Sequence, residues 1–148
     1  MPIEDKIKQS KFRNERHRLL ANLFYQYNGL INEHQKLLKP YDISFQQFNI
    51  LSILRGQYPN AASIQLIKER MIDQNSDVSR LVDRLLKKKF FNRTTCPKDR
   101  RQVDVVITQA GLDILKKIDL QTSQFDSLVS SLSEEEARTL NQLLDKIR

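Results

Sequence analysis

The segment from Asn75 to Gly111 constrains the fold of this 148-residue chain more than any other part of its sequence. The segment opens with apolar residues at helical spacing, which are Val78, Leu81, Val82, Leu85 and Leu86. Ser76 is a candidate N-cap, because its hydroxyl can accept a hydrogen bond from a free N–H of the first turn. The spacing therefore predicts a short helix with one packed face and one solvent face.

Two strand patterns follow this helix. Residues 91–96 predict a first strand, and the apolar–polar alternation of residues 102–107 predicts a second, half-buried strand. The sequence PKDRR at 97–101 supplies turn formers between them, and Thr108 is a candidate N-cap for a further helix. A helix joined to a two-stranded hairpin has the form of a winged helix-turn-helix, in which the helix enters the major groove of DNA.

The same segment carries most of the positive charge of the chain. Residues 74–101 hold nine Lys or Arg against three Asp, a net charge of +6, whereas the whole chain has +7. Clustered cations favour phosphate binding, because neutralised phosphates release condensed counterions. A solvated lysine face on an ordinary helix is the alternative for the helix alone, and the basic hairpin shifts the balance toward nucleic acid.

The remaining sequence predicts helices. Residues 20–38 trace one apolar stripe, which ends before Pro40, and a stripe from 112 to 132 is interrupted. Ser63 is expected to cap a short helix through Arg70, and capping-box patterns begin at Ser44 and Ser133. One chain of this size can only partly cover apolar faces this long. We therefore expect a homodimer built from both chain ends, with a monomeric bundle as the alternative.

Several sequence blocks together resemble the MarR family of bacterial transcription regulators. They are DISFQQFNILSIL at 42–54, DVSRLVDRL at 77–85, Asn92-Arg93, DRRQVDVVIT at 99–108 and QAG at 109–111, in the family's order. Family members usually have Gly where this chain has Lys89, which leaves the turn after the basic helix costlier by ~1 kcal/mol.

The resemblance implies a mainly α fold. It is a winged helix-turn-helix with a two-stranded β wing and long terminal helices that form an intertwined dimerisation region. Residues 1–148 would be a single unit, with a DNA-binding lobe at 42–108 and dimerisation helices at 1–41 and 109–148.

The expected partner is double-stranded DNA, and the candidate contacts fall into three groups. Residues of the basic helix are expected to read the major groove, because arginine suits the guanine edge and short polar side chains suit bases or phosphates; they are Ser76, Asp77, Ser79, Arg80 and Arg84. Arg100, with Arg101 second, is expected to reach the minor groove. Lys87, Lys88 and Lys98 are expected to contact phosphates, and Asp99 to pair with an arginine that holds the wing.

Enzyme chemistry finds no support in the sequence. The three glycines are widely separated, so no phosphate-binding loop exists, and His17 and His34 lie too far apart on one helix to share a metal. We expect no catalytic residue, no cofactor and no metal. The single cysteine, Cys96, excludes an intrachain disulfide, and an incidental role is favoured over a redox sensor. With no apolar run of ~20 residues, a cytoplasmic protein without membrane contact is expected.

Aromatic residues gather between Phe24 and Tyr58. By the resemblance, an effector cleft lies between the dimer helices and the DNA-binding lobe. Phe24, Tyr27, Phe45 and Phe48 are candidates to line it for a small aromatic or phenolic effector, although plain core packing is the favoured alternative. The expected function is a homodimeric regulator of a pseudo-palindromic operator, by resemblance a repressor. A winged-helix protein–protein interaction module is the alternative.

Overall fold

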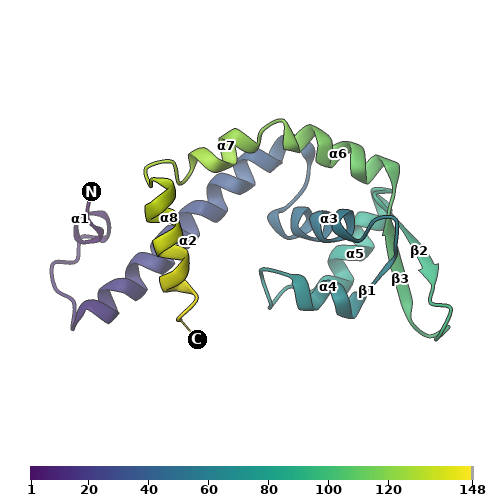
Figure 1. Cartoon of the computed structure of the whole chain (residues 1–148), viewed down its shortest axis with the longest axis horizontal. Helices are drawn as coiled ribbons and strands as arrows, with labels where there is room; N and C mark the ends of the chain where they lie inside the picture. The colour runs from purple at the N-terminus through teal and green to yellow at the C-terminus, as the bar shows by residue number, and fades with distance from the viewer. Residues whose placement is uncertain (148) are drawn as a thin grey trace.

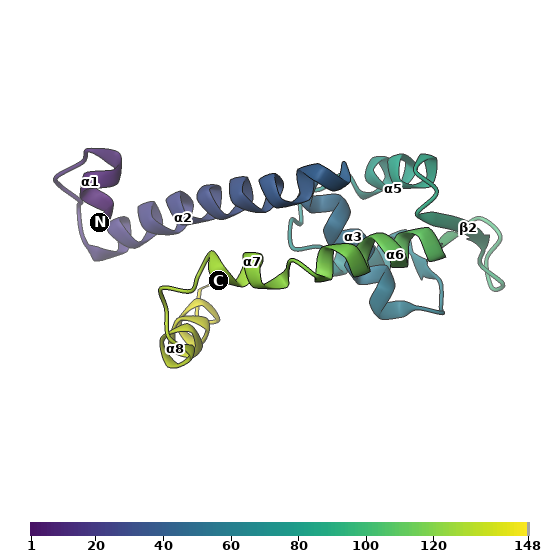
Figure 2. The same cartoon turned by 90° about the horizontal axis from the view of Figure 1, so that it is seen from above.

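The computed structural model describes residues 1–147 and places a winged-helix lobe at one end of an elongated molecule. Figure 1 shows a long helix running from this lobe toward the N-terminus. The two helices that follow the wing in sequence lead away from the lobe in the same direction. The last helix overlaps the long one in that view, but Figure 2 shows that it stands well apart from it. The two ends of the chain therefore extend away from the lobe.

The chain forms helices and three short strands. Eight α-helices are present in the described residues: α1 (Ile3–Ile7), α2 (Glu15–Leu38), α3 (Phe45–Gln57), α4 (Ile64–Arg70), α5 (Val78–Lys87), α6 (Gln109–Asp119), α7 (Thr122–Ser127) and α8 (Glu134–Leu144). A 3-10 helix, η1 (Lys39–Tyr41), joins α2 to α3. The strands are β1 (Ala62–Ser63), β2 (Phe91–Thr95) and β3 (Val103–Ile107).

Four of the five predicted N-caps are confirmed. Each of these hydroxyls accepts a hydrogen bond from the backbone N–H three residues later, as seen for Ser44, Ser63, Thr108 and Ser133. Both predicted capping boxes close, since Gln47 and Glu136 return a bond to the cap backbone. The bond from the Ser133 N–H lowers the pKa of Glu136.

Ser76 was the wrong cap for α5. Asp77 caps this helix, and its Oδ1 accepts from the Arg80 N–H at 3.2 Å. Ser76 lies in the preceding turn, where its carbonyl accepts from the Val78 N–H at 3.0 Å. A carboxylate at this position adds an interaction with the positive end of the helix that a hydroxyl lacks.

The sheet has three antiparallel strands in the order β1-β3-β2, where the sequence predicted only two. The hairpin is confirmed, with Phe91 opposite Ile107 and Thr95 opposite Val103. The added strand β1 pairs Ala62 with Val105. Two residues are too few to show an alternating pattern, so β1 could not be found from periodicity.

The hydrophobic core lies in the winged-helix lobe. The predicted apolar stripe of α5 supplies Val78, Val82 and Leu85, each at most 2% exposed. They pack in one cluster with residues of α3, the sheet and α6, which include Ile50, Leu54, Phe91, Val105 and Leu115. From α2 only Leu38 is buried, and α8 has no buried residue. The lobe is therefore packed within one chain, whereas much of the apolar surface of the terminal helices is not.

Lys89 adopts a left-handed backbone conformation, which favours glycine at the end of a helix. Its φ is 62°, and the Lys89 N–H donates to the Leu86 carbonyl at 2.9 Å. The Phe90 N–H donates to the Leu85 carbonyl at 3.2 Å, which completes the two bonds of a Schellman motif. The motif ends α5 despite the side chain, so the left-handed residue carries a steric cost.

Replacing this lysine with glycine should therefore stabilise the protein. We expect Lys89→Gly to raise the free energy of unfolding by about 1 kcal/mol, because relief of the left-handed strain exceeds the added freedom of the unfolded chain. Lys87→Gly, inside the helix, should lower it by about 1 kcal/mol. Urea denaturation measures both, and a loss of stability in Lys89→Gly would contradict the assignment.

Gly111 permits α6 to approach the end of α5. A Cβ at this position would lie 2.6 Å from the Phe90 carbonyl oxygen and 2.7 Å from Ile107 Cγ1. The same carbonyl accepts from the Thr108 N–H at 2.9 Å, so it cannot move away freely. The base of the wing thus depends on a residue without a side chain.

Gly111→Ala should accordingly destabilise the lobe by about 1–3 kcal/mol, as overpacked sites do. Gly56→Ala is the matched control, because a Cβ there meets no atom within 4 Å and lies inside α3. This control should gain about 0.5–1 kcal/mol from the better helix propensity of alanine. Thermal or urea unfolding compares the pair, and equal effects would refute the close approach.

Candidate nucleic-acid interface

Helix α5 presents a polar face to solvent opposite its buried stripe. The Arg80 side chain is 73% exposed, and the other polar residues on this face are exposed as well: Asp77, Ser79, Asp83, Arg84 and Lys87. The structure thus brings together most of the residues predicted to read the major groove and one predicted phosphate contact.

Two ion pairs order the arginines around this face. Arg80 Nε lies 3.6 Å from Asp77 Oδ2 within the first turn of α5. Arg93 on β2 donates from Nη2 to Asp83 Oδ1 at 2.5 Å, which joins the wing to the helix. All four side chains are more than half exposed, so each pair contributes little stability and serves mainly to orient its arginine.

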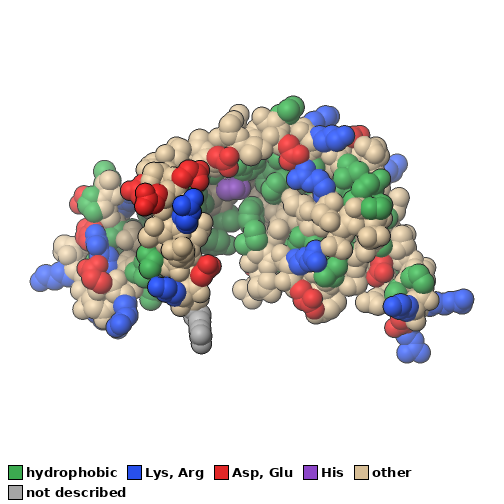
Figure 3. Space-filling view, viewed as in Figure 1, with side chains coloured by type: hydrophobic (Ala, Val, Ile, Leu, Met, Phe, Trp, Pro, Cys, Tyr) green, Lys and Arg blue, Asp and Glu red, His purple; other side chains and the backbone are tan. Residues whose placement is uncertain are grey.

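The wing tip carries three exposed cations, Lys98, Arg100 and Arg101. Figure 3 shows Lys and Arg side chains projecting from the molecule at this corner. Among residues 1–147 no carboxylate lies within ion-pair distance of any of the three. The tip is therefore a set of uncompensated positive charges at the end of a two-stranded support.

Asp99 holds the wing turn differently from the expected arginine pairing. Its Oδ1 accepts from the Arg101 backbone N–H at 2.9 Å, and its carbonyl accepts from the Gln102 N–H at 3.0 Å. The predicted pairing with a guanidinium was wrong, because a short aspartate side chain in a turn bonds most readily to the backbone two residues on. Arg101 is nevertheless positioned through this bond.

Ser76 and Lys88 lie differently from the other residues that the sequence predicts to contact DNA. Ser76 Oγ is inaccessible to solvent and has no hydrogen-bond partner in the described chain. Lys88 turns back to the protein, where its Nζ donates to the Asp42 carbonyl and lies 3.1 Å from Asp42 Oδ2. Its side chain is 29% exposed. Both residues are therefore less exposed to solvent than the residues on the polar face of α5.

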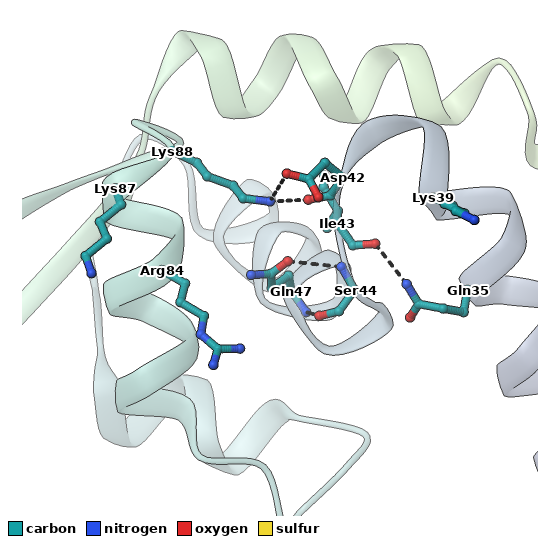
Figure 4. A pocket seen from close by; sticks show the side chains of 9 residues that line it. All are labelled: Gln35, Lys39, Asp42, Ile43, Ser44, Gln47, Arg84, Lys87 and Lys88. Carbon is teal, nitrogen blue, oxygen red and sulfur yellow. Dashed lines mark hydrogen bonds and ion pairs between the residues drawn. The ribbon is translucent and has the colours of Figure 1, made fainter.

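A cavity of about 570 Å³ separates the second half of α5 from the junction of α2 and α3. Figure 4 shows Arg84 directed into this space, whereas Lys39 and Lys87 point away from it and Lys88 bridges to Asp42. The lysines around the rim therefore do not converge on one point.

The four aromatic residues expected to line an effector site are split in the structure. Phe45 and Phe48 lie in a cluster, where Phe48 stacks on Phe125 at 6.1 Å and Phe45 meets the His34 ring edge-on at 5.6 Å. Phe24 and Tyr27 lie earlier on α2 than His34 and are 65% and 54% exposed. Helical spacing on α2 could not show which of its aromatics reach the lobe.

The described residues give little support for a metal site or a membrane-spanning segment. No group of three or more His, Cys, Asp or Glu within residues 1–147 is arranged to hold a metal ion. Cys96 is a free, partly exposed thiol directly after β2. None of the described helices combines the length and the apolar character needed to cross a bilayer.

The helix α4, the amphipathic helix α5 and the hairpin behind it define a winged helix-turn-helix protein. Residues 43–103 match the model of the MarR family. The chain is 27% identical over 132 residues to the HTH-type transcriptional regulator MhqR of Bacillus subtilis, covering 87% of this chain and 86% of that protein. These matches, together with the fold, support a transcriptional regulator of the MarR type.

Solved structures agree with this assignment. A cysteine-to-serine variant of MarR from E. coli, in complex with operator DNA, is 26% identical with a TM-score of 0.79, covering 93% of this chain and 98% of that one. BpsR of Bordetella bronchiseptica, whose DNA binding is regulated by 6-hydroxynicotinic acid, is 26% identical with a TM-score of 0.74. Coverage there is 84% of this chain and 88% of BpsR.

Two contacts at the interface escaped the sequence reasoning. The Arg93–Asp83 pair spans 10 positions and two elements, and the Lys88–Asp42 contact spans 46. Neither spacing has a helical or strand period that a pattern could reveal. Only the packing of α5 against the sheet and the junction brings these groups together.

Proposed function

We propose that this protein binds a specific DNA operator as a homodimer and represses the genes beside it. The observation that carries the proposal is the pairing of an exposed reading face on α5 with a wing tip of three uncompensated cations. Arg80 and Arg84, with Ser79 and Asp77, would meet base edges in the major groove. Lys87 and Lys98 would contact phosphates, and Arg100 and Arg101 would enter the minor groove.

The backbone conformation supports DNA binding. The fold is closer to the DNA-bound E. coli MarR, at a TM-score of 0.79, than to apo MarR, at 0.69. The backbone is thus similar to that of a relative bound to its operator.

The uncovered ends of the chain support dimerisation. Leu20, Phe24 and Tyr27 on α2 are 48%, 65% and 54% exposed, and α8 exposes Leu143 by 53%. An 11-residue helix without a buried side chain is marginal in water, so α8 requires a surface to pack on. A second copy of the chain would supply apolar faces of the same kind. In this proposal, the DNA-binding region is residues 42–108. The dimer interface is formed by residues 1–41 together with residues 109–148.

Dimerisation gives a direct prediction. Sedimentation equilibrium at micromolar concentration should give about twice the 17.5 kDa chain mass. Leu143→Glu should shift the protein toward monomer, because a charge would enter the apolar contact. Lys146→Glu, one turn further along, is the charge control and should stay dimeric. A folded wild-type monomer at that concentration would contradict the proposal.

An effector would act at the junction of the two regions. The cluster of His34, Phe45, Phe48 and Phe125 joins α2, α3 and α7 there, and BpsR shows that a relative responds to an aromatic acid. A flat aromatic acid that binds here more tightly in a DNA-incompetent state would weaken the operator complex, and DNA would weaken the effector by the same factor.

Base readers and phosphate contacts should respond differently to alanine. On the duplex that the wild type selects from random DNA, Arg80→Ala should cost about 1–3 kcal/mol and relax base preference. Lys87→Ala should weaken selected and random duplexes alike and lower the salt slope by about one unit. Fluorescence anisotropy over a salt series measures both variants. Identical behaviour of the two would refute this division, and equal wild-type affinity for all sequences would refute the proposed function.

A further inference from the structure

The short connector at residues 39–43, between α2 and α3, is held from three directions. Gln35 of α2 donates to the Ile43 carbonyl at 3.4 Å and accepts from the Phe45 N–H at 3.2 Å. Gln121, next to α7, bonds the Tyr41 hydroxyl at 2.6 Å. The third hold comes from Lys88, at the end of α5. The connector is therefore the place where the terminal helices and the DNA-reading helix meet.

The Lys88 contact is directional. Its ammonium group donates to the Asp42 carbonyl and lies 3.1 Å from the Asp42 carboxylate, as Figure 4 shows. Asp42 is left-handed, with φ 55°. The Asp42 side chain is 97% exposed, whereas that of Lys88 is only 29% exposed. The lysine is thus the anchored partner, and its charge is turned away from the reading face.

We propose that Lys88 is a positioning residue that sets the angle of α5 relative to the terminal helices, and that it does not contact phosphate. This rests on the proposed function, since it concerns how the dimer presents its two reading helices. The angle at which two helices pack depends on the side chains at their contact. A hydrogen bond from the end of α5 to the connector adds a fixed point to that packing, because it acts at the point farthest from the N-terminal turn of α5.

A small change of angle is enough to matter for DNA. Helix α5 has 10 residues and is therefore ~15 Å long, so a tilt of ~10° about one end moves the other by ~3 Å. That displacement is about one base-pair step, which is ~3.4 Å. The two readers of a dimer must lie one helical turn apart, ~34 Å, to enter successive major grooves. Loss of the Lys88 contact should therefore loosen the preferred spacing of half-sites.

A phosphate contact and a positioning contact predict opposite results at Asp42. If Lys88 contacts phosphate, removing the Asp42 charge frees the lysine and strengthens DNA binding. If Lys88 positions the helix, removing that charge weakens the bond and weakens DNA binding, although the protein becomes more positive. Asn is the suitable replacement because it also tolerates the left-handed conformation.

The experiment measures affinity of four proteins: wild type, Lys88→Met, Asp42→Asn and the matched control Lys87→Met. Each is titrated over a salt series against the duplex that the wild type selects. Each is also titrated against duplexes whose half-site spacing is one base pair longer or shorter. Thermal melting accompanies each variant, and the exposed Asp42→Asn change keeps the test valid if Lys88→Met folds poorly.

Positioning predicts that Lys88→Met lowers affinity for the selected duplex about tenfold and flattens the spacing preference, while its salt slope stays at the wild-type value. Asp42→Asn should lower affinity about two- to fivefold, the range of an exposed pair. Lys87→Met should lower the slope by about one unit and keep the spacing preference.

A lower salt slope in Lys88→Met, or tighter binding by Asp42→Asn, would overturn the inference. So would an unchanged spacing preference with reduced melting temperature, which would mean that the contact only stabilises the fold. These results leave the proposed function intact as long as the wild type prefers its selected duplex. A wild type without sequence preference would instead overturn the proposed function and, with it, this inference.

Discussion

The structure depends on helix α5, which packs against the core with one face and exposes polar side chains on the other. Helix α5 is tied into the lobe by Val78, Val82 and Leu85, and this burial fixes which side chains face outward. Because the helix period is 3.6 residues, burying that stripe places Ser79, Arg80 and Arg84 on solvent-facing sides. The hairpin, the capping aspartate and the Schellman turn all serve to hold this helix in register with the core.

Contacts at two places tie α5 to the rest of the molecule. The wing is joined to α5 by Arg93 and Asp83, and the terminal helices are joined to it through the connector at 39–43. The lobe is packed within one chain, whereas α8 has no fully buried residue. The lobe therefore has a hydrophobic core of its own, whereas the terminal helices leave apolar side chains exposed. In our account, the second copy of the chain covers these side chains and fixes the distance between two reading helices.

Local features could be predicted from the sequence, and contacts between distant segments could not. Ser44, Ser63, Thr108 and Ser133 act within three residues of themselves, so their caps follow from the sequence pattern. Ser76 was predicted as the cap of α5, whereas Asp77 is the cap, because both of these adjacent residues suit the position. The turn of Lys88 toward Asp42 and the separation of Phe24 from Phe48 depend on how helices pack, which carries no local signal.

The central claim is that two copies of this lobe read DNA together at a fixed separation. Selection of bound duplexes from random DNA by the purified wild-type protein tests it most directly. The account predicts an inverted repeat whose half-site centres lie about 10 base pairs apart, one helical turn. Recovery of single half-sites, of repeats without a fixed spacing, or of no preferred sequence would contradict it.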